Sequence, residues 1–176
     1  TLVEGKKAGL STVGGDASPA SRFAARVKCN WKLRPDHLLW HLDRALSVAR
    51  RQRGKATRDP TLVYLTESGM IERGWISRAP LERALTLKRA IHNSGAPRPY
   101  REAMMLALID AVVRDISNVR FGPELYVGPK RMRVDIVDAF ASRVALFAND
   151  LANVSPTKGS TRVLAGDARR IDALLR

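Results

Sequence analysis

Hydrophobic side chains recur every three or four residues over most of the chain, which is the spacing of an amphipathic helix. From Val137 to Leu151 the apolar positions follow a 3-4-3-4 rhythm. Residues 103–113 carry Asp110 as their only charge, so this helix is expected to be central in its domain. With prolines and glycines that suit helix starts and stops, the pattern predicts helices over residues 1–8, 19–31, 35–49, 75–91, 103–113 and 137–151.

Three short runs favour β-structure instead: Leu10–Val13, Thr61–Leu65 and Arg162–Ala165. The first and the last are each followed by glycine and then by an acid, Asp16 in one case and Asp167 in the other. Two such strand-then-acid ends predict an α/β sheet, and the largely helical stretch between them predicts an insertion. We therefore expect three parts, covering residues 1–31, 32–158 and 159–176.

The net charge of the chain indicates the class of its binding partner. The chain has 31 Lys and Arg against 17 Asp and Glu, a formal net charge of +14, and residues 28–133 supply +11 of it, with 21 basic and 10 acidic residues. Such a surface favours nucleic acid as the partner, with an anionic membrane surface as the alternative. No run approaches the roughly 18 apolar residues of a membrane span, and the first residues lack the layout of a signal peptide. We expect a cytoplasmic location.

Cysteine and histidine are too scarce to predict a metal site. Cys29 is the single cysteine, which excludes an internal disulfide and a multi-cysteine zinc site, and it is expected to be a small buried residue. His37 and His41 are four residues apart and share a helical face, but no HExxH glutamate accompanies them. They are expected to be partly exposed helix residues.

Two basic segments are candidates for contacts with DNA. The first surrounds Gly54 and suits either a solvated helix end or a phosphate-facing loop; it contains Arg50, Arg51, Arg53, Lys55 and Arg58. The second, Ser117–Val134, is rich in Gly and Pro, predicts a long loop, and carries Arg120, Lys130, Arg131 and Arg133. Within it, Asn118 and Arg120 also have the chemistry to pair with base edges.

A cofactor site is predicted at the first strand-then-acid end. In doubly wound sheets, an acid at the carboxyl end of a strand can accept hydrogen bonds from both hydroxyls of a ribose. Asp16, with Ala17 and Ser18 after it, therefore predicts a site for an adenosine-containing cofactor. The same residues also suit an ordinary turn followed by a helix N-cap, and the local pattern does not decide between the two.

In their order along the chain, these motifs resemble the amino-methylating DNA methyltransferases, which use S-adenosylmethionine to modify adenine N6 or cytosine N4. The opening run resembles the segment after the family's glycine motif, up to the acid of the second strand: TLVEGKKAGLSTVGGDASPASRFAARVK. The closing run resembles the third-strand motif: VLAGDARRIDALL. Two inner runs are similar to helical segments in one branch of the family: YLTESGMIERGWISRAPLERALTLKRAI and ALIDAVVRDISNVRFGPEL.

The resemblance implies a Rossmann-like class I methyltransferase fold with a large, mostly helical insertion between strands. It implies that Asp16 takes the ribose-binding position for S-adenosylmethionine, with Ala17 and Ser18 beside it, and that Asp167 and Ala168 approach the cofactor adenine. It also implies that a target base rotates out of duplex DNA while basic residues contact the strands around the gap. DNA and S-adenosylmethionine are thus the expected partners.

Two motifs of that family are missing from the chain. The aromatic-x-Gly-x-Gly loop is expected before Thr1, and the Pro-Pro-aromatic motif that holds the target amine is expected after Arg176. No catalytic residue is therefore assigned, and we expect an internal segment that works with the remainder of the same methyltransferase. A non-catalytic nucleic-acid-binding or regulatory protein is the alternative. Half of a nicotinamide-dependent oxidoreductase is a third interpretation, but the glycines form no GxGxxG fingerprint.

Overall fold

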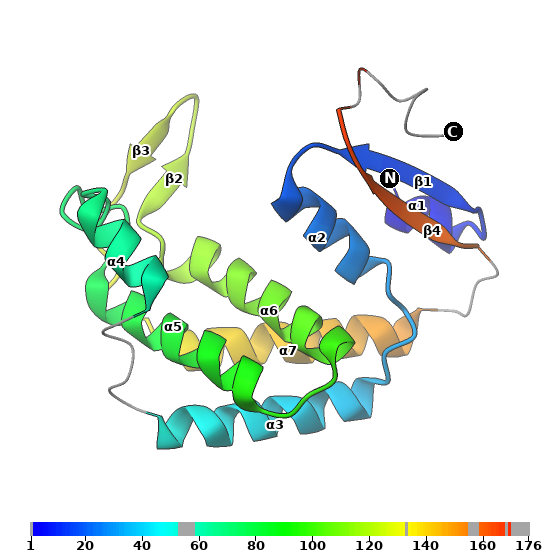
Figure 1. The fold of residues 1–176 in the computed structure, drawn as a ribbon, viewed down its shortest axis with the longest axis horizontal. Helices are drawn as coiled ribbons and strands as arrows, with labels where there is room; N and C mark the ends of the chain where they lie inside the picture. Colours follow the sequence, from blue (N-terminus) through cyan, green and yellow to red (C-terminus); the bar gives the residue numbers. More distant parts are fainter. Residues whose placement is uncertain (1, 53–58, 133, 155–158, 168, 170–176) are drawn as a thin grey trace. The chain divides into compact units, whose positions relative to one another are not determined.

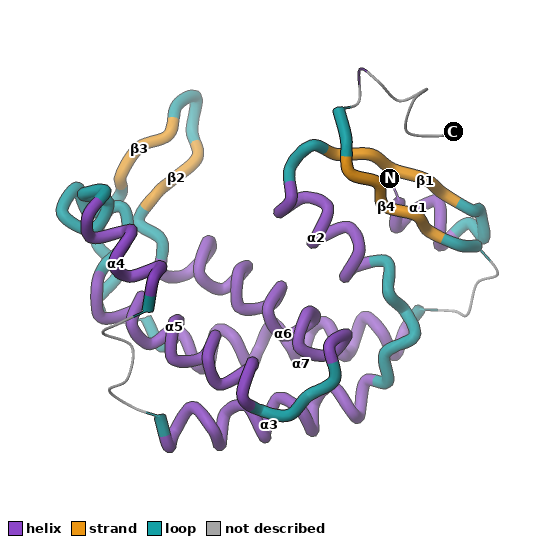
Figure 2. Tube along the Cα trace, viewed as in Figure 1, coloured by secondary structure: helices purple, strands orange, loops and turns teal. Residues whose placement is uncertain are grey.

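The computed structural model describes residues 2–52, 59–132, 134–154, 159–167 and 169. The chain divides into two compact units, one formed by residues 1–35 and 149–176 and the other by residues 36–148. The first unit contains a small parallel sheet, and the second is mostly helical (Figures 1 and 2). The protein is therefore of mixed α/β composition. The second unit falls within the predicted insertion, residues 32–158.

The first unit is built around two parallel strands, β1 (Thr12–Asp16) and β4 (Thr161–Ala165). Helix α1 (Leu2–Lys7) is followed by a turn at Gly9, whose φ of 76° is the left-handed conformation that stops a helix. Helix α2 (Pro19–Lys28) follows β1 directly. The parallel pairing joins segments about 150 residues apart in sequence, as the two strand-then-acid ends predict.

Close packing explains two glycines of this unit. A Cβ on Gly14, inside β1, would lie 2.9 Å from Leu2 Cδ1, so α1 packs directly on the strand there. A Cβ on Gly159, just before β4, would lie 2.3 Å from the carbonyl oxygen of Leu10. Because that neighbour is backbone, only glycine lets the two chain segments come this close.

The second unit is a helical assembly with one hairpin. Its helices are α3 (Pro35–Arg51), α4 (Pro60–Glu67), α5 (Arg78–Asn93), α6 (Arg98–Ala111) and α7 (Ile136–Asn153), the last of which continues into the first unit. Its core contains fully buried apolar side chains from several of these helices, among them Leu38, Leu87, Ile91, Met104, Phe140 and Val144. Burial of such side chains contributes roughly 1.5–3 kcal/mol each, which accounts for the packing of the helices against one another.

A π-helical turn, Val112–Ile116, continues α6 and takes part in an ion-pair network. Arg143 of α7 donates from Nε to Asp110 Oδ2 at 2.6 Å and places Nη2 2.8 Å from Asp115 Oδ2. Burial raises the pKa of Asp110, but the hydrogen bonds and charges of Arg114 and Arg143 outweigh it and leave the pKa below its usual value. The network thus ties α6 and the π-helical turn to α7.

The structure corrects several predictions. Thr61–Leu65 is not a strand but part of α4, because Asp59 caps the helix by accepting a hydrogen bond from the amide of Thr61 at 2.9 Å and Pro60 occupies the first helical position. The predicted strand Leu10–Val13 is displaced: β1 runs from Thr12 through both glycines to Asp16. The helix predicted from residue 75 begins at residue 78.

Residues 117–134 are likewise not a plain loop. They contain an antiparallel hairpin of β2 (Val119–Phe121) and β3 (Leu125–Val127), which projects from the helices (Figure 1). His41 is also a correction, because it is buried, not partly exposed, whereas His37 is exposed. Periodicity placed both histidines on α3 but did not show which neighbours cover them.

Candidate functional site

The parallel pairing brings the two predicted acids to one edge of the sheet. Asp16 is the last residue of β1 and pairs with Ala165, the last residue of β4. The amide of Gly166 donates to the carbonyl oxygen of Asp16 at 3.3 Å, and Asp167 follows at once. Ligands of parallel sheets bind outside the carboxyl ends of the strands, so this edge is the candidate site.

The turn after β1 fixes the carboxylate of Asp16. Its Oδ1 accepts a hydrogen bond from the amide of Ser18 at 2.7 Å, and Ser18 Oγ in turn accepts one from the amide of Ser21 at 3.3 Å as the N-cap of α2. The ordinary-turn interpretation is therefore correct as a description of the local geometry. The turn uses only Oδ1 of the Asp16 carboxylate. No donor among the described residues reaches Oδ2.

Arg22 holds the same turn from the first part of α2. Its Nη1 donates to the carbonyl oxygens of Asp16 at 2.8 Å and of Ala17 at 2.7 Å. A cation near a helix N-terminus is unfavourable with respect to the helix dipole, so its place there is compensated by these charge-assisted bonds. Sequence reasoning missed Arg22; the signal was an arginine in the opening part of a helix where an acid is usual.

An open cavity of about 510 Å³ lies beside Asp16, which is within the size range of small-molecule sites. Its lining combines backbone of the two strand glycines with polar and apolar side chains from β1, β4, α1 and α2: Leu2, Thr12, Val13, Gly14, Gly15, Asp16, Ser21, Arg22, Ala25 and Val163. Ala17 and Ser18 form the turn at its edge and are not lining residues. The cavity therefore offers a few polar groups on an apolar wall.

Asp167 has a different environment. Arg169 holds both of its carboxylate oxygens, with Nε at 3.0 Å from Oδ1 and 2.9 Å from Oδ2, and Arg169 Nη2 is also paired with Oδ2. These bonds, with one from the Arg169 amide, lower the pKa of Asp167. In this conformation both carboxylate oxygens of Asp167 are hydrogen-bonded to Arg169. Ala168, the other predicted adenine contact, lies outside the described residues.

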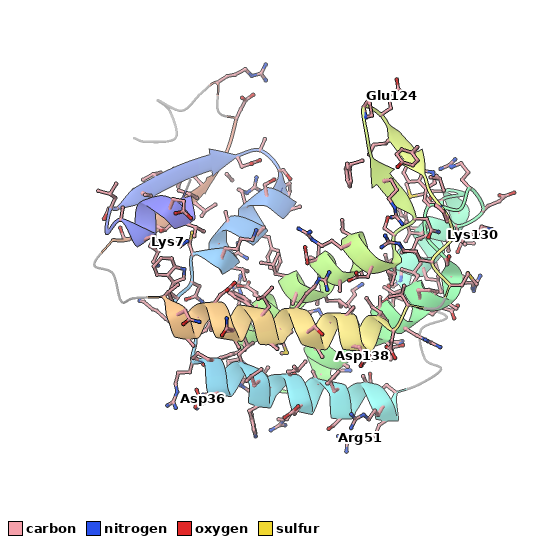
Figure 3. The ribbon with its side chains drawn as sticks, turned by 180° about the vertical axis from the view of Figure 1, so that it is seen from behind. Lys7, Asp36, Arg51, Glu124, Lys130 and Asp138 are labelled. Carbon is pink, nitrogen blue, oxygen red and sulfur yellow. The ribbon has the colours of Figure 1, made fainter. Side chains whose placement is uncertain are left out.

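The first basic segment is described only in part. Arg50 and Arg51 are exposed in the last turn of α3, and Figure 3 shows Arg51 at the end of that helix. Arg53, Lys55 and Arg58 lie outside the described residues, as does Arg133 of the second segment. The two described arginines are accessible to a phosphate backbone.

In the second basic segment, Asn118 has a structural role. It is fully buried; its Nδ2 donates to the carbonyl oxygen of Gly74 at 2.8 Å, and its Oδ1 accepts from the amide of Arg131 at 2.8 Å. Contact with a base edge would require both bonds to break. The side chain therefore anchors the base of the hairpin.

The other members of that segment differ in exposure. Arg120 is half-buried and donates from Nη1 to the carbonyl oxygens of Ser117 and Val119, and Arg131 donates to the carbonyl oxygen of Arg114. Lys130 is exposed. The strands between them leave large apolar side chains exposed: Phe121, Leu125, Tyr126 and Val127. Sequence reasoning identified the charges of this segment but not its apolar face.

Comparisons with models of protein families, with curated proteins and with solved structures find no significant match to this chain. Within the described ranges, every helix is too short or too polar to cross a bilayer. The same ranges hold no cluster of three or more His, Cys, Asp or Glu placed to bind a metal ion.

Proposed function

We propose that this chain is a segment of a DNA methyltransferase that transfers a methyl group from S-adenosylmethionine to an exocyclic amine of adenine or cytosine. The observation that carries the proposal is the parallel pairing of β1 with β4, which brings Asp16, the last residue of β1, and Asp167, two residues after β4, to the same sheet edge. A turn alone does not require a partner strand with its own acid. Ligands of parallel α/β sheets bind outside the carboxyl ends of the strands, and both acids lie at that end of this sheet.

The residues beside the cavity fit the adenosine part of that cofactor. Asp16 is exposed, its Oδ1 is fixed by Ser18, and no described residue bonds Oδ2, so the carboxylate is oriented and still able to accept from a ribose hydroxyl. The cavity beside it has room for a nucleoside. The cofactor supplies the methyl group to be transferred. Asp16 binds and orients; we assign it no part in the chemistry.

The helical unit supplies the polyanion-binding surface in this proposal. Arg50, Arg51 and Lys130 are exposed cations suited to DNA phosphates, and the excess of basic residues over residues 28–133 supports the same partner. Phosphate contacts fix orientation without reading bases. The chain contains no Pro-Pro dipeptide, so the residues that hold the target amine would come from the remainder of the same enzyme. We place the enzyme in the cytoplasm.

Titration calorimetry of the chain with S-adenosylmethionine tests the proposal. Asp16→Ala is expected to weaken binding about tenfold, the equivalent of one hydrogen bond to a charged acceptor. Asp150→Ala is the matched control, because Asp150 is an exposed aspartate on α7 that does not line the cavity. Equal affinities for wild type, Asp16→Ala and Asp150→Ala would refute the assignment.

A non-catalytic nucleic-acid-binding protein is the second candidate, favoured by the exposed cations of the helical unit. Titrating the chain with a nucleic acid as well as with S-adenosylmethionine and adenosine separates the two proposals. Nucleic-acid binding without any affinity for S-adenosylmethionine or adenosine would favour the second candidate over the first.

A further inference from the structure

The helical unit has an open groove of about 370 Å³ along the exposed face of α3. Trp40, Arg44, Ser47 and Arg51 line it from positions i, i+4, i+7 and i+11, so they form one stripe along the helix. Asn93 and Ser94, at the carboxyl end of α5, complete the lining with Asp43 and Val48 of α3. No predicted site except Arg51 falls in this groove.

The stripe begins with an exposed cation–π pair of Trp40 and Arg44. The side chain of Trp40 is 54% exposed, which is high for so large an apolar group. The guanidinium of Arg44 lies over its indole, with Cζ 4.8 Å from the ring centroid. Aromatic rings and guanidinium planes are the surfaces on which unpaired nucleobases stack. The Trp40–Arg44 pair therefore offers a base two groups of the kind on which it stacks.

The charges of the groove suit the rest of a nucleotide. Two arginines face one acid among the lining residues, so the lining has a net positive charge. Arg51, about two helical turns from Arg44, is placed to pair with a phosphate while the base rests on the Trp40–Arg44 pair. Bases in a duplex are already stacked on their neighbours, so this geometry selects an unpaired strand.

We propose that this groove binds one nucleotide of a single-stranded nucleic acid, with the base on the Trp40–Arg44 pair and the phosphate on Arg51. DNA and RNA share this chemistry. The proposal is independent of the cofactor site, because it needs neither Asp16 nor S-adenosylmethionine.

Tryptophan fluorescence tests it with a ten-nucleotide oligothymidylate as the probe. Because stacking quenches the indole, the probe is expected to quench the wild type and to leave Trp40→Phe with little quenching, since only Trp31 and Trp75 remain. Oligouridylate tests RNA in a parallel titration, and a blunt hairpin duplex tests paired DNA. Quenching by either single strand, and not by the duplex, supports the proposal.

Two arginine variants provide a matched comparison. Arg51→Ala is expected to weaken binding of the oligothymidylate about tenfold at moderate salt, whereas Arg83→Ala, with the same charge change at an exposed position of α5 outside the lining, is expected to weaken it less than about threefold. Equal effects of the two variants would overturn the proposal, because they indicate diffuse electrostatic attraction. Unchanged quenching in Trp40→Phe, or equal quenching by the duplex, would also overturn it.

Discussion

Asp16 and Ala165 lie opposite each other as the last paired residues of β1 and β4. The hydrogen bond from the amide of Gly166 to the carbonyl oxygen of Asp16 continues this contact one residue further. This pairing brings residues from near both ends of the described chain to one edge of the sheet. The candidate site at that edge requires the two strands to remain paired.

Gly159→Ala should destabilise this pairing. Its new Cβ would lie 2.3 Å from the carbonyl oxygen of Leu10, so the backbone must shift, at a cost of about 1–3 kcal/mol in the free energy of unfolding measured with urea. Ser160→Ala is the control, because it removes only the exposed bond between Ser160 Oγ and Ser11 Oγ. Wild-type stability in Gly159→Ala would contradict the close approach.

Arg22→Ala should loosen the turn that carries Asp16 without unfolding the chain. The variant loses the two bonds from Nη1 to the carbonyl oxygens of Asp16 and Ala17, both at an exposed position. Hydrogen exchange at the Ser18 amide, which is bonded to Asp16 Oδ1, is therefore expected to accelerate several-fold, while the global free energy of unfolding changes by less than about 1 kcal/mol. Unchanged exchange at Ser18 would show that Arg22 does not hold the turn.

Asn118→Ala should cost stability, since its side chain is buried. The variant leaves the carbonyl oxygen of Gly74 and the amide of Arg131 without their partner, which predicts a loss of about 2–4 kcal/mol in urea unfolding. Asn118→Asp keeps the acceptor for Arg131 and loses the donor to Gly74, so it separates the two bonds. A variant of wild-type stability with altered DNA sequence preference would instead restore the base-contact interpretation.

Stability should depend on the ionisation of His41. Burial, followed by the charges of Arg44 and His37, lowers the pKa of His41 below its ordinary 6.5. The folded state keeps the ring neutral, whereas the unfolded chain takes up a proton as the pH falls below 6.5. The contribution of neutral His41 to the free energy of unfolding is therefore fully present above pH 6.5 and is lost as the pH falls toward the folded-state pKa.

The loss is at most about 1.4 kcal/mol per pH unit for one proton. Urea unfolding between about pH 7.5 and about pH 5.5 should therefore show a steeper decline for the wild type than for His41→Phe, which keeps an aromatic ring and removes the titration. Parallel curves for the two proteins would contradict the assignment.

The sequence predicted what local patterns determine. Apolar spacing located the major helices, and glycine followed by aspartate located the ends of β1 and β4. The strand predicted at residues 61–65 was wrong because capping by Asp59 overrides the β-propensity of Thr61 and Val63. The role of Asn118 was not predictable, because its partner Gly74 is 44 residues away in sequence. The groove on α3 was missed for the same reason, since Asn93 and Ser94 come from another helix.

The most direct test of the central claim pairs ligand changes with a protein change at Asp16. Calorimetry should compare adenosine, 2′-deoxyadenosine and 3′-deoxyadenosine on the wild type and on Asp16→Asn. If the carboxylate accepts bonds from the ribose, the deoxy ligands bind the wild type more weakly, by roughly tenfold for a full charged hydrogen bond, and the difference shrinks in the variant. Equal affinities for the three ligands, or a difference that persists unchanged in Asp16→Asn, would contradict a ribose site at the end of β1.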